Sequence, residues 1–226
     1  TLVLEDVPSP VPGVGQVRLR VHACALGFPD TLIINDQYQM RPPRPFSPGG
    51  EVAGVVDEVD LLGPQRVVAG DVAIAIGSSG LHSNGYSLAR HVAFNVAGLD
   101  VHDHVAEFER TLGEELLEPT QIYAKDILNL IGAIPVHSIS HITGGGIAAN
   151  VARVMPAELA LDLDRSTWTP QAIFAWLQAR GNIEQIEAEK TFNMGIGMLA
   201  FVPASAAQIA ITALQASGLN AWVCGE

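Results

Sequence analysis

The sequence predicts an α+β fold in which helices flank a mixed β-sheet, preceded by a short, proline-rich, all-β segment. Eight of the fourteen prolines lie within the first 48 residues, and prolines at that density exclude long helices and central strands. From about residue 67 onward, apolar runs alternate with segments of helical periodicity, separated by glycine-rich turns. We therefore predict a β segment at residues 1–58 and an α+β domain at residues 59–226.

The elements follow from local patterns, taken in chain order. In the first segment, short runs bounded by proline and glycine predict strands at residues 2–4, 16–23, 42–48 and 51–59. In the larger domain, Pro119 and Thr120 form a start signal for a helix at 121–131, and Thr169 is the predicted N-cap of a helix at 170–179. The other predicted helices lie at residues 86–96, 147–154 and 204–216, the strands at 72–76, 137–143, 159–163, 197–202 and 220–224, and a polar connection at 98–114.

Composition restricts the classes of function. The chain has 226 residues and is 48% hydrophobic, which is enough for a sizeable core. Its net charge of −12, with Lys125 and Lys190 as its two lysines, argues against binding nucleic acid through the phosphate backbone. No apolar run approaches the roughly 18 residues that span a bilayer, and no signal-peptide pattern opens the chain. We therefore expect a cytoplasmic protein with neither a membrane nor a nucleic acid as its partner.

The run GSSGLHSNGYSLAR, residues 77–90, predicts a ligand-binding loop between a strand and a helix. Its small polar residues free backbone N–H groups and supply hydroxyls at the start of a helix, where a phosphate or another anion is favoured. His82 is the side chain there that exchanges protons near neutral pH, although a loop histidine can equally be an ordinary surface residue. The candidate binding residues in this loop are Ser78, Ser79, Gly80, Ser83, Asn84 and Gly85.

A second glycine-rich turn repeats this strand, glycine and helix arrangement, so the two loops together can hold two ends of one ligand. Its spacing also fits the dinucleotide fingerprint G-x-G-x-x-A, which ends at Ala149. Against a dinucleotide-binding domain, the preceding strand HSISHIT is polar on one face and the following helix is short. A tight structural turn is the remaining interpretation. The candidate residues are Thr143, Gly144, Gly145 and Gly146.

Other polar residues give weaker signals. Asn193 precedes a glycine-rich strand and is a candidate ligand contact, with a β-bulge as the alternative. His137 and His141 share a strand face without a third ligand, so no metal site is predicted, and the distant cysteines Cys24 and Cys224 predict neither a zinc site nor a disulfide framework. A solvated helix start is the expected role of Glu114, Glu115 and Glu118.

Five segments between about residues 61 and 226 carry a family resemblance: GDVAIAIGSSGLHSNGYSLAR, LLEPTQIYAKDIL, HSISHITGGGIAANVARVMP, WTPQAIFAWLQARGNIE and TFNMGIGM. Together they resemble the C-terminal domain of aminoimidazole ribonucleotide synthetase, the phosphoribosylformylglycinamidine cyclo-ligase of purine synthesis. In that family ATP activates the formamide oxygen of formylglycinamidine ribonucleotide, and an internal amine closes the imidazole ring with loss of phosphate. The resemblance implies that His82 is catalytic and that Ser83, Asn84 and residues 144–146 hold substrate and phosphate groups.

Residues 1 to about 58 resemble a different family. The runs PGVGQVRLRVHACALGFPDTLIINDQYQ and PFSPGGEVAGVV are similar to the start of the GroES-like domain of a medium-chain quinone oxidoreductase. Gly50 stands where zinc-dependent relatives carry a histidine, so the resemblance is to the zinc-free branch. Residues 53–56 fit either family. The chain is therefore expected to be a chimera or a misjoined fragment that carries one truncated domain of each family.

The cyclo-ligase resemblance has consequences for cofactors and activity. That family binds ATP and magnesium through a G-T-D-G-V-G-T-K type segment of its N-terminal half, which these 226 residues do not contain. We therefore expect the chain to bind a small phosphorylated ribonucleotide and to be inactive alone. An NADPH-dependent quinone oxidoreductase-like protein and a non-catalytic folding or interaction unit are the alternatives. The oligomeric state, a homodimer included, is left open.

Overall fold

The computed structural model describes residues 20–25, 33–35, 51–55 and 61–226. The chain divides into two compact units, Thr1–Leu61 and Leu62–Glu226. In the first unit, β1 (Arg20–Ala25) and β2 (Glu51–Val55) form an antiparallel pair. These two strands overlap those predicted at 16–23 and 51–59, whereas the strands predicted at 2–4 and 42–48 lie outside the described residues.

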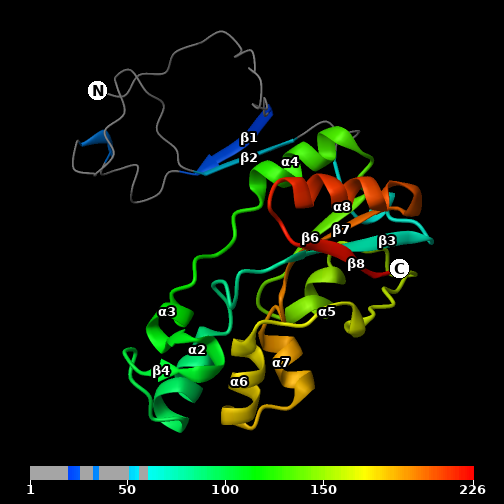
Figure 1. Ribbon diagram of the computed structural model, residues 1–226. Helices are drawn as coiled ribbons and strands as arrows, with labels where there is room; N and C mark the ends of the chain where they lie inside the picture. Colours follow the sequence, from blue (N-terminus) through cyan, green and yellow to red (C-terminus); the bar gives the residue numbers. More distant parts are fainter. Residues whose placement is uncertain (1–19, 26–32, 36–50, 56–60) are drawn as a thin grey trace. The chain divides into compact units, whose positions relative to one another are not determined.

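The second unit is built on a four-stranded antiparallel sheet (Figure 1). Two strands with continuous apolar runs lie at its centre, and they pair in register from Asp71 opposite Pro203 to Ile76 opposite Met198. The sheet confirms four of the five strands predicted for this domain. The strands, in spatial order, are β6 (Ser138–His141), β7 (Ile196–Pro203), β3 (Asp71–Gly77) and β8 (Ala221–Gly225).

Alternate residues of the central strands face opposite helical layers, as the pleat of a sheet requires. Ile74 and Ile76 lie in a core with α4 (Ala124–Ala133) and α8 (Ala207–Ala216). Ala73 and Ala75 lie in a second core, which includes Val151 of α5 (Gly146–Val151). Figure 1 shows α4 and α8 above the sheet and α5 below it. The α+β fold with helices flanking the sheet is therefore confirmed, whereas the expected mixed pairing is wrong, because all three strand pairs of this sheet are antiparallel.

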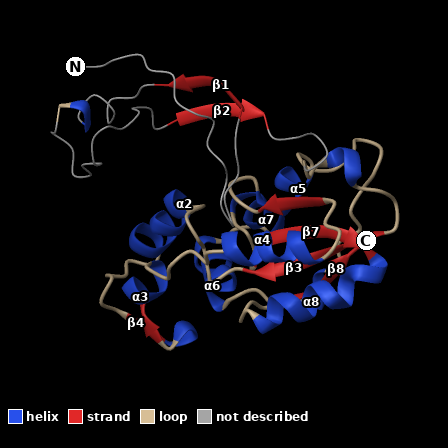
Figure 2. Cartoon of the chain, turned by 90° about the horizontal axis from the view of Figure 1, so that it is seen from above, coloured by secondary structure: helices blue, strands red, loops and turns tan. Residues whose placement is uncertain are grey.

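A third cluster of buried residues lies among short helices to one side of the sheet (Figure 2). One of these helices, α2 (Tyr86–Arg90), continues as a π-helical turn over His91–Val96, which confirms the helix predicted at 86–96. The others are α3 (Leu112–Leu116), α6 (Ala172–Gly181) and α7 (Gln185–Thr191). None of the helices in the part of the chain that the structure describes is long and apolar enough to cross a membrane.

Two predicted helix starts are wrong. The helix expected at 121–131 begins only at Ala124, because the hydroxyl of Tyr123 is hydrogen-bonded to the Gly77 carbonyl and holds the preceding chain against the sheet. The helix expected at 170–179 begins at Ala172. Its N-cap is Gln171 rather than Thr169, and the Gln171 side chain bonds the distant Ser78 carbonyl instead of capping the helix.

The strand predicted at 159–163 is also wrong. This segment meets β8 through one isolated bridge, Leu163 to Gly225, and Asp162 exchanges two hydrogen bonds with Glu226, just beyond that strand. Upstream, the Leu159 amide bonds the Pro156 carbonyl in a turn, so no regular ladder forms. Helix α7 was not among the predicted elements.

The predicted polar connection at 98–114 contains regular structure. It folds into a small hairpin of β4 (His104–Val105) and β5 (Arg110–Thr111), which leads directly into α3. Thr111 and Glu114 form a capping box, in which each side chain bonds the other residue's backbone N–H. The expected helix start is therefore confirmed at Glu114. The prediction is wrong for Glu118, which lies beyond the end of α3, and Glu115 and Glu118 both pair with Arg110 instead of being simply solvated.

We expect Thr111→Ala to lower the free energy of unfolding of the second unit by about 1 kcal/mol, because the N-cap hydroxyl would be lost. The measurement is urea unfolding followed by tryptophan fluorescence, since all three tryptophans lie within residues 62–226. Thr212→Ala is the control: Thr212 is exposed within α8 and bonds only the Gln208 carbonyl and amide, so its loss should be neutral or stabilising. Equal effects of the two substitutions would contradict the prediction.

Candidate functional site

The two predicted loops emerge at the same edge of the sheet. The serine loop, residues 77–85, follows β3 and precedes α2, and the glycine loop, residues 143–146, follows β6 and precedes α5. Both β3 and β6 pair antiparallel with β7, so they run in the same direction and end together beside the start of β7. The sheet topology therefore places the loops side by side.

A direct hydrogen bond joins the two loops. The Asn84 Oδ1 atom accepts it from the Gly144 N–H at 3.1 Å. Ser83 and Gly144 are exposed, and Asn84 is half-buried beside them. The Ser83 hydroxyl lies 3.3 Å from that of Thr120, and the Ser79 hydroxyl donates to the Pro119 carbonyl at 2.6 Å. The structure thus brings the two loops together, as the sequence predicted, and the segment before α4 forms a further wall.

His82 lies beneath the serine loop rather than on its surface. The residue is 4% exposed, and its backbone adopts a left-handed conformation with φ 57°. The Nε2 atom accepts a hydrogen bond from the Ser79 N–H at 3.1 Å, so the neutral ring carries its proton on Nδ1. That Nδ1 atom is buried and has no partner among the described residues. Burial, assisted by the charge of His141, lowers the pKa of His82.

Tyr123 and Gly197 form the floor under His82, and neither was among the predicted site residues. The Tyr123 hydroxyl donates to the Gly77 carbonyl at 2.7 Å, and its ring centroid lies 6.0 Å from that of His82. Burial raises the Tyr123 pKa, which keeps the phenol a neutral donor. A Cβ atom on Gly197 would overlap the Tyr123 hydroxyl and stand 3.0 Å from Cε1 of His82. A glycine is therefore required here for the two rings to approach β7.

Asn193 holds the serine loop in shape from below. It is fully buried, and its Oδ1 atom accepts from the Ser78 hydroxyl at 3.1 Å and from the Gly195 N–H at 2.9 Å. Its Nδ2 atom donates to the Gly80 carbonyl at 2.9 Å. Gln171 donates to the Ser78 carbonyl, and its buried Oε1 atom has no partner among the described residues. Contact of Ser78, Gly80 or Asn193 with a ligand remains a prediction.

The glycine loop is tied to its own helix by Asn150. The Asn150 amide donates to the Gly146 carbonyl at 2.7 Å and accepts from the Thr143 hydroxyl at 3.0 Å. Gly145 and Gly146 have φ values of 99° and 67°, and a Cβ on Gly146 would overlap the Glu189 carbonyl. The tight-turn interpretation therefore accounts for these glycines. A dinucleotide fingerprint belongs to a parallel βαβ unit, whereas β6 pairs antiparallel with β7.

The described residues contain no cluster of three metal-ligating side chains. His137 bonds the buried Asp71 carboxylate at 2.7 Å through Nδ1, whereas His141 is exposed. Burial raises the pKa of the free thiol of Cys224 to about 12, so this cysteine is not a nucleophile at neutral pH. The two loops offer backbone N–H groups, hydroxyls and amides. This donor set fits a phosphate group and does not fit magnesium, which prefers carboxylates.

We expect His82 to titrate below 6.5, because burial disfavours its charged form. Its folded pKa lies below its unfolded value, so the unfolded chain binds more protons and stability falls as the pH drops from about 6.5 through the folded pKa. The measurement is an NMR titration of the histidine Cε1 protons. His141→Gln should raise the pKa of His82 slightly, and His102→Gln should leave it unchanged. A His82 pKa at or above 6.5 would contradict the prediction.

Comparison with known proteins divides the chain between two families. Residues 13–99 match the alcohol dehydrogenase GroES-like domain, and residues 68–226 match the family described as AIR synthase related protein, C-terminal domain. The two matches overlap at residues 68–99. These residues carry β3, the central strand of the second unit, and α2. The likeness to a GroES-like domain at the start of the chain is therefore confirmed.

Two relatives support the larger match. A Streptomyces fradiae protein named "Putative phosphoribosylformylglycinamidine cyclo-ligase" is 54% identical over 158 residues, which are 70% of this chain and 87% of that protein. The phosphoribosylformylglycinamidine cyclo-ligase of Alkaliphilus oremlandii is 42% identical over 177 residues, 78% of this chain. The alignment spans about half, 52%, of the Alkaliphilus protein. The chain therefore belongs to the family of AIR synthase related proteins, because its residues 68–226 match the C-terminal domain of that family.

Proposed function

We propose that the second unit is the substrate-binding half of a phosphoribosylformylglycinamidine cyclo-ligase site, and that its ligand is formylglycinamidine ribonucleotide. The observation that carries the proposal is the Asn84 to Gly144 hydrogen bond, which joins two glycine-rich loops into one polar surface. Family membership of residues 68–226 supports the choice of ligand.

The exposed part of this surface suits the phosphate of a ribonucleotide. Helix α2, which continues into the π-helical turn, has Gly85 as its N-cap, and this residue is left-handed and provides no side-chain cap bond. The first N–H groups of this helix thus remain available to an anion, at the positive end of the helix dipole. Ser83, two residues before this N-cap, is exposed, and so is Gly144 of the other loop. Asn84 sets the distance between the two loops.

In this proposal His82 acts through the proton on Nδ1. A buried polar atom without a partner costs about 1–3 kcal/mol, so its persistence in the fold calls for a role. The lowered pKa keeps the ring neutral at pH 7, and the bond from Ser79 fixes which nitrogen carries the proton. A shift of the serine loop on substrate binding would aim this N–H at the oxygen of the reacting amide, where negative charge develops.

ATP and magnesium belong to the half of the family's site that is outside residues 68–226. When bound, ATP supplies activation of the formamide oxygen, and none of the loop residues described above provides a magnesium ligand set. The chain also spans only about half of the Alkaliphilus relative. We therefore propose that this chain binds the ribonucleotide and that turnover requires the ATP-binding half.

A second candidate function is NADPH binding, which the match of residues 13–99 to the alcohol dehydrogenase GroES-like domain favours. Its fingerprint would lie at residues 144–149, in a loop whose flanking strand is antiparallel to its neighbour. Gly146→Val is not a test of this candidate, because a Cβ at that position collides with the Glu189 backbone and would damage the fold. Direct titration with NADPH is the suitable test.

We expect calorimetric titration of the full chain to show saturable binding of formylglycinamidine ribonucleotide and none of NADPH at millimolar concentration. Asn84→Ala should weaken ribonucleotide binding roughly tenfold, because the bond that positions the glycine loop is lost. Asn95→Ala is the matched control, since Asn95 is exposed on the following π-helical turn. Binding of NADPH alone would overturn the proposal in favour of the oxidoreductase.

We expect His82→Asn to lower turnover by about 100-fold or more once the chain is fused to the N-terminal half of the Alkaliphilus relative. Asparagine tolerates the left-handed backbone at this position, so the fold should survive. Ribonucleotide affinity should change much less than turnover. Unchanged turnover would remove His82 from the mechanism.

A further inference from the structure

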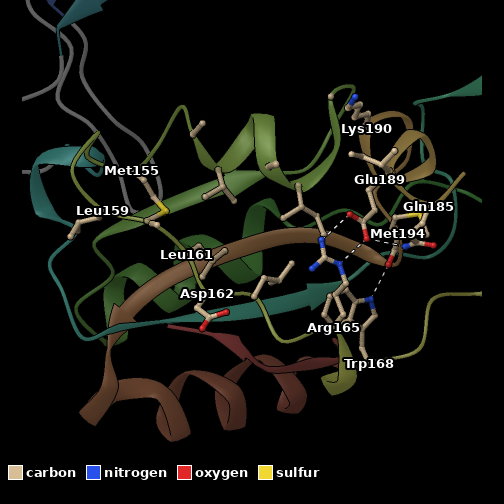
Figure 3. Close-up of a pocket in the computed structure, with 18 of the residues that line it drawn as sticks. Met155, Leu159, Leu161, Asp162, Arg165, Trp168, Gln185, Glu189, Lys190 and Met194 are labelled. Carbon is tan, nitrogen blue, oxygen red and sulfur yellow. Dashed lines mark hydrogen bonds and ion pairs between the residues drawn. The ribbon is translucent and has the colours of Figure 1, made fainter.

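A groove of 840 Å³ lies on the α5 side of the sheet, between α5, α7 and residues 155–170 (Figure 3). Ligand pockets in proteins span roughly 300–1,000 Å³, so this volume suits one small molecule. The groove shares Gly145 with the glycine loop, but His82 and the serine loop do not line it. It is therefore separate from the surface proposed to bind the ribonucleotide.

The walls of the groove are largely apolar because this face of the sheet is thinly covered. On the opposite face, two ten-residue helices, α4 and α8, close the core, whereas α5 has six residues. Large side chains of the core on the α5 side thus remain only partly buried and line the groove. They include Ile147, Met155, Leu159, Leu161, Leu163 and Trp168.

Positive charge gathers at one end of the groove. Arg165 donates from Nε and Nη2 to the two carboxylate oxygens of Glu189, at 2.7 and 2.8 Å. This bidentate pair fixes the guanidinium and leaves its Nη1 atom without a protein partner in the described chain. Lys190 lines the groove and, within residues 61–226, makes no ion pair. Figure 3 shows Arg165, Trp168 and Lys190 toward one end of the groove, Met155 and Leu159 toward the other, and Asp162 between the two ends, below Leu161.

Glu189 offsets one of the two positive charges at this end of the groove, so Arg165, Lys190 and Glu189 together carry one net positive charge. Its Oε1 atom also accepts from the Gln185 amide at 2.9 Å, so both carboxylate oxygens are engaged. In a chain of net charge −12, a site with Arg165 and Lys190 at one end is a local exception. The apolar walls and the cationic end together suit an amphipathic anion.

We propose that this groove binds a small aromatic molecule that carries one carboxylate. The ring occupies the space between Met155, Leu161 and Trp168, where polarisable sulfur and indole surfaces favour it. The carboxylate lies toward Arg165 and Lys190 and away from Asp162. The inference does not depend on the ribonucleotide site or on any activity of the chain.

The test is calorimetric titration of the full chain with 1-naphthaleneacetate, and with the uncharged 1-naphthaleneacetamide as a matched ligand. We expect saturable, one-to-one binding of the acetate, roughly fivefold or more tighter than that of the amide. Arg165→Gln and Lys190→Gln should each reduce this preference. Lys125→Gln is the control for Lys190→Gln, since Lys125 is the other lysine and lies on α4, on the opposite side of the sheet.

Substitutions at two neighbouring exposed alanines of α5 test whether the ligand binds in the groove. Ala148 lines the groove and Ala149 does not, so Ala148→Trp should block binding and Ala149→Trp should preserve it. Ala160→Trp, at another exposed lining position, checks the result if Ala148→Trp disturbs the fold. Any of three results would overturn the proposal: the acetate shows no saturable binding below about 5 mM, the acetate and the amide bind with equal affinity, or the blocking substitutions leave binding unchanged.

Discussion

The pairing of β3 with β7 is the constraint on which the rest of the second unit depends. It is antiparallel from Asp71 opposite Pro203 to Ile76 opposite Met198, and both strands are buried on both faces. Because β6 also pairs with β7, the strands that precede the two glycine-rich loops end at one edge. Just beyond the paired residues of the two strands, the backbone N–H of Ser78 donates to the Gly195 carbonyl. The strand register therefore also fixes where the serine loop begins.

The site combines a rigid underside with an exposed rim. Asn193, Asn150 and Tyr123 each bond the backbone of a loop from below, and these bonds satisfy polar groups that would otherwise be buried without partners. His82 Nδ1 and Gln171 Oε1 are exceptions, because both are buried and lack a partner in the described chain. Ser83 and Gly144 at the rim are exposed, and the Gly144 N–H is engaged by Asn84. Such a division keeps the loops preorganised while leaving donors for a ligand.

Unequal cover of the two sheet faces explains why the molecule has a groove away from this site. Two ten-residue helices seal one face, and a six-residue helix with an irregular segment covers the other. The Arg165 to Glu189 ion pair bridges that segment and α7 across the open side. The same irregularity that prevents residues 159–163 from joining the sheet therefore also creates the space.

The sequence by itself determined the elements and the loops that local pattern controls. Continuous apolar runs predicted β3 and β7, and glycine, serine and asparagine after β3 and β6 predicted the loops, because these residues permit left-handed turns and free backbone donors. Only the tertiary structure decided the roles of Tyr123, Gln171 and Gly197, whose partners lie 46 or more residues away. The shifted starts of α4 and α6 have the same cause, since long-range hydrogen bonds outweigh local start signals.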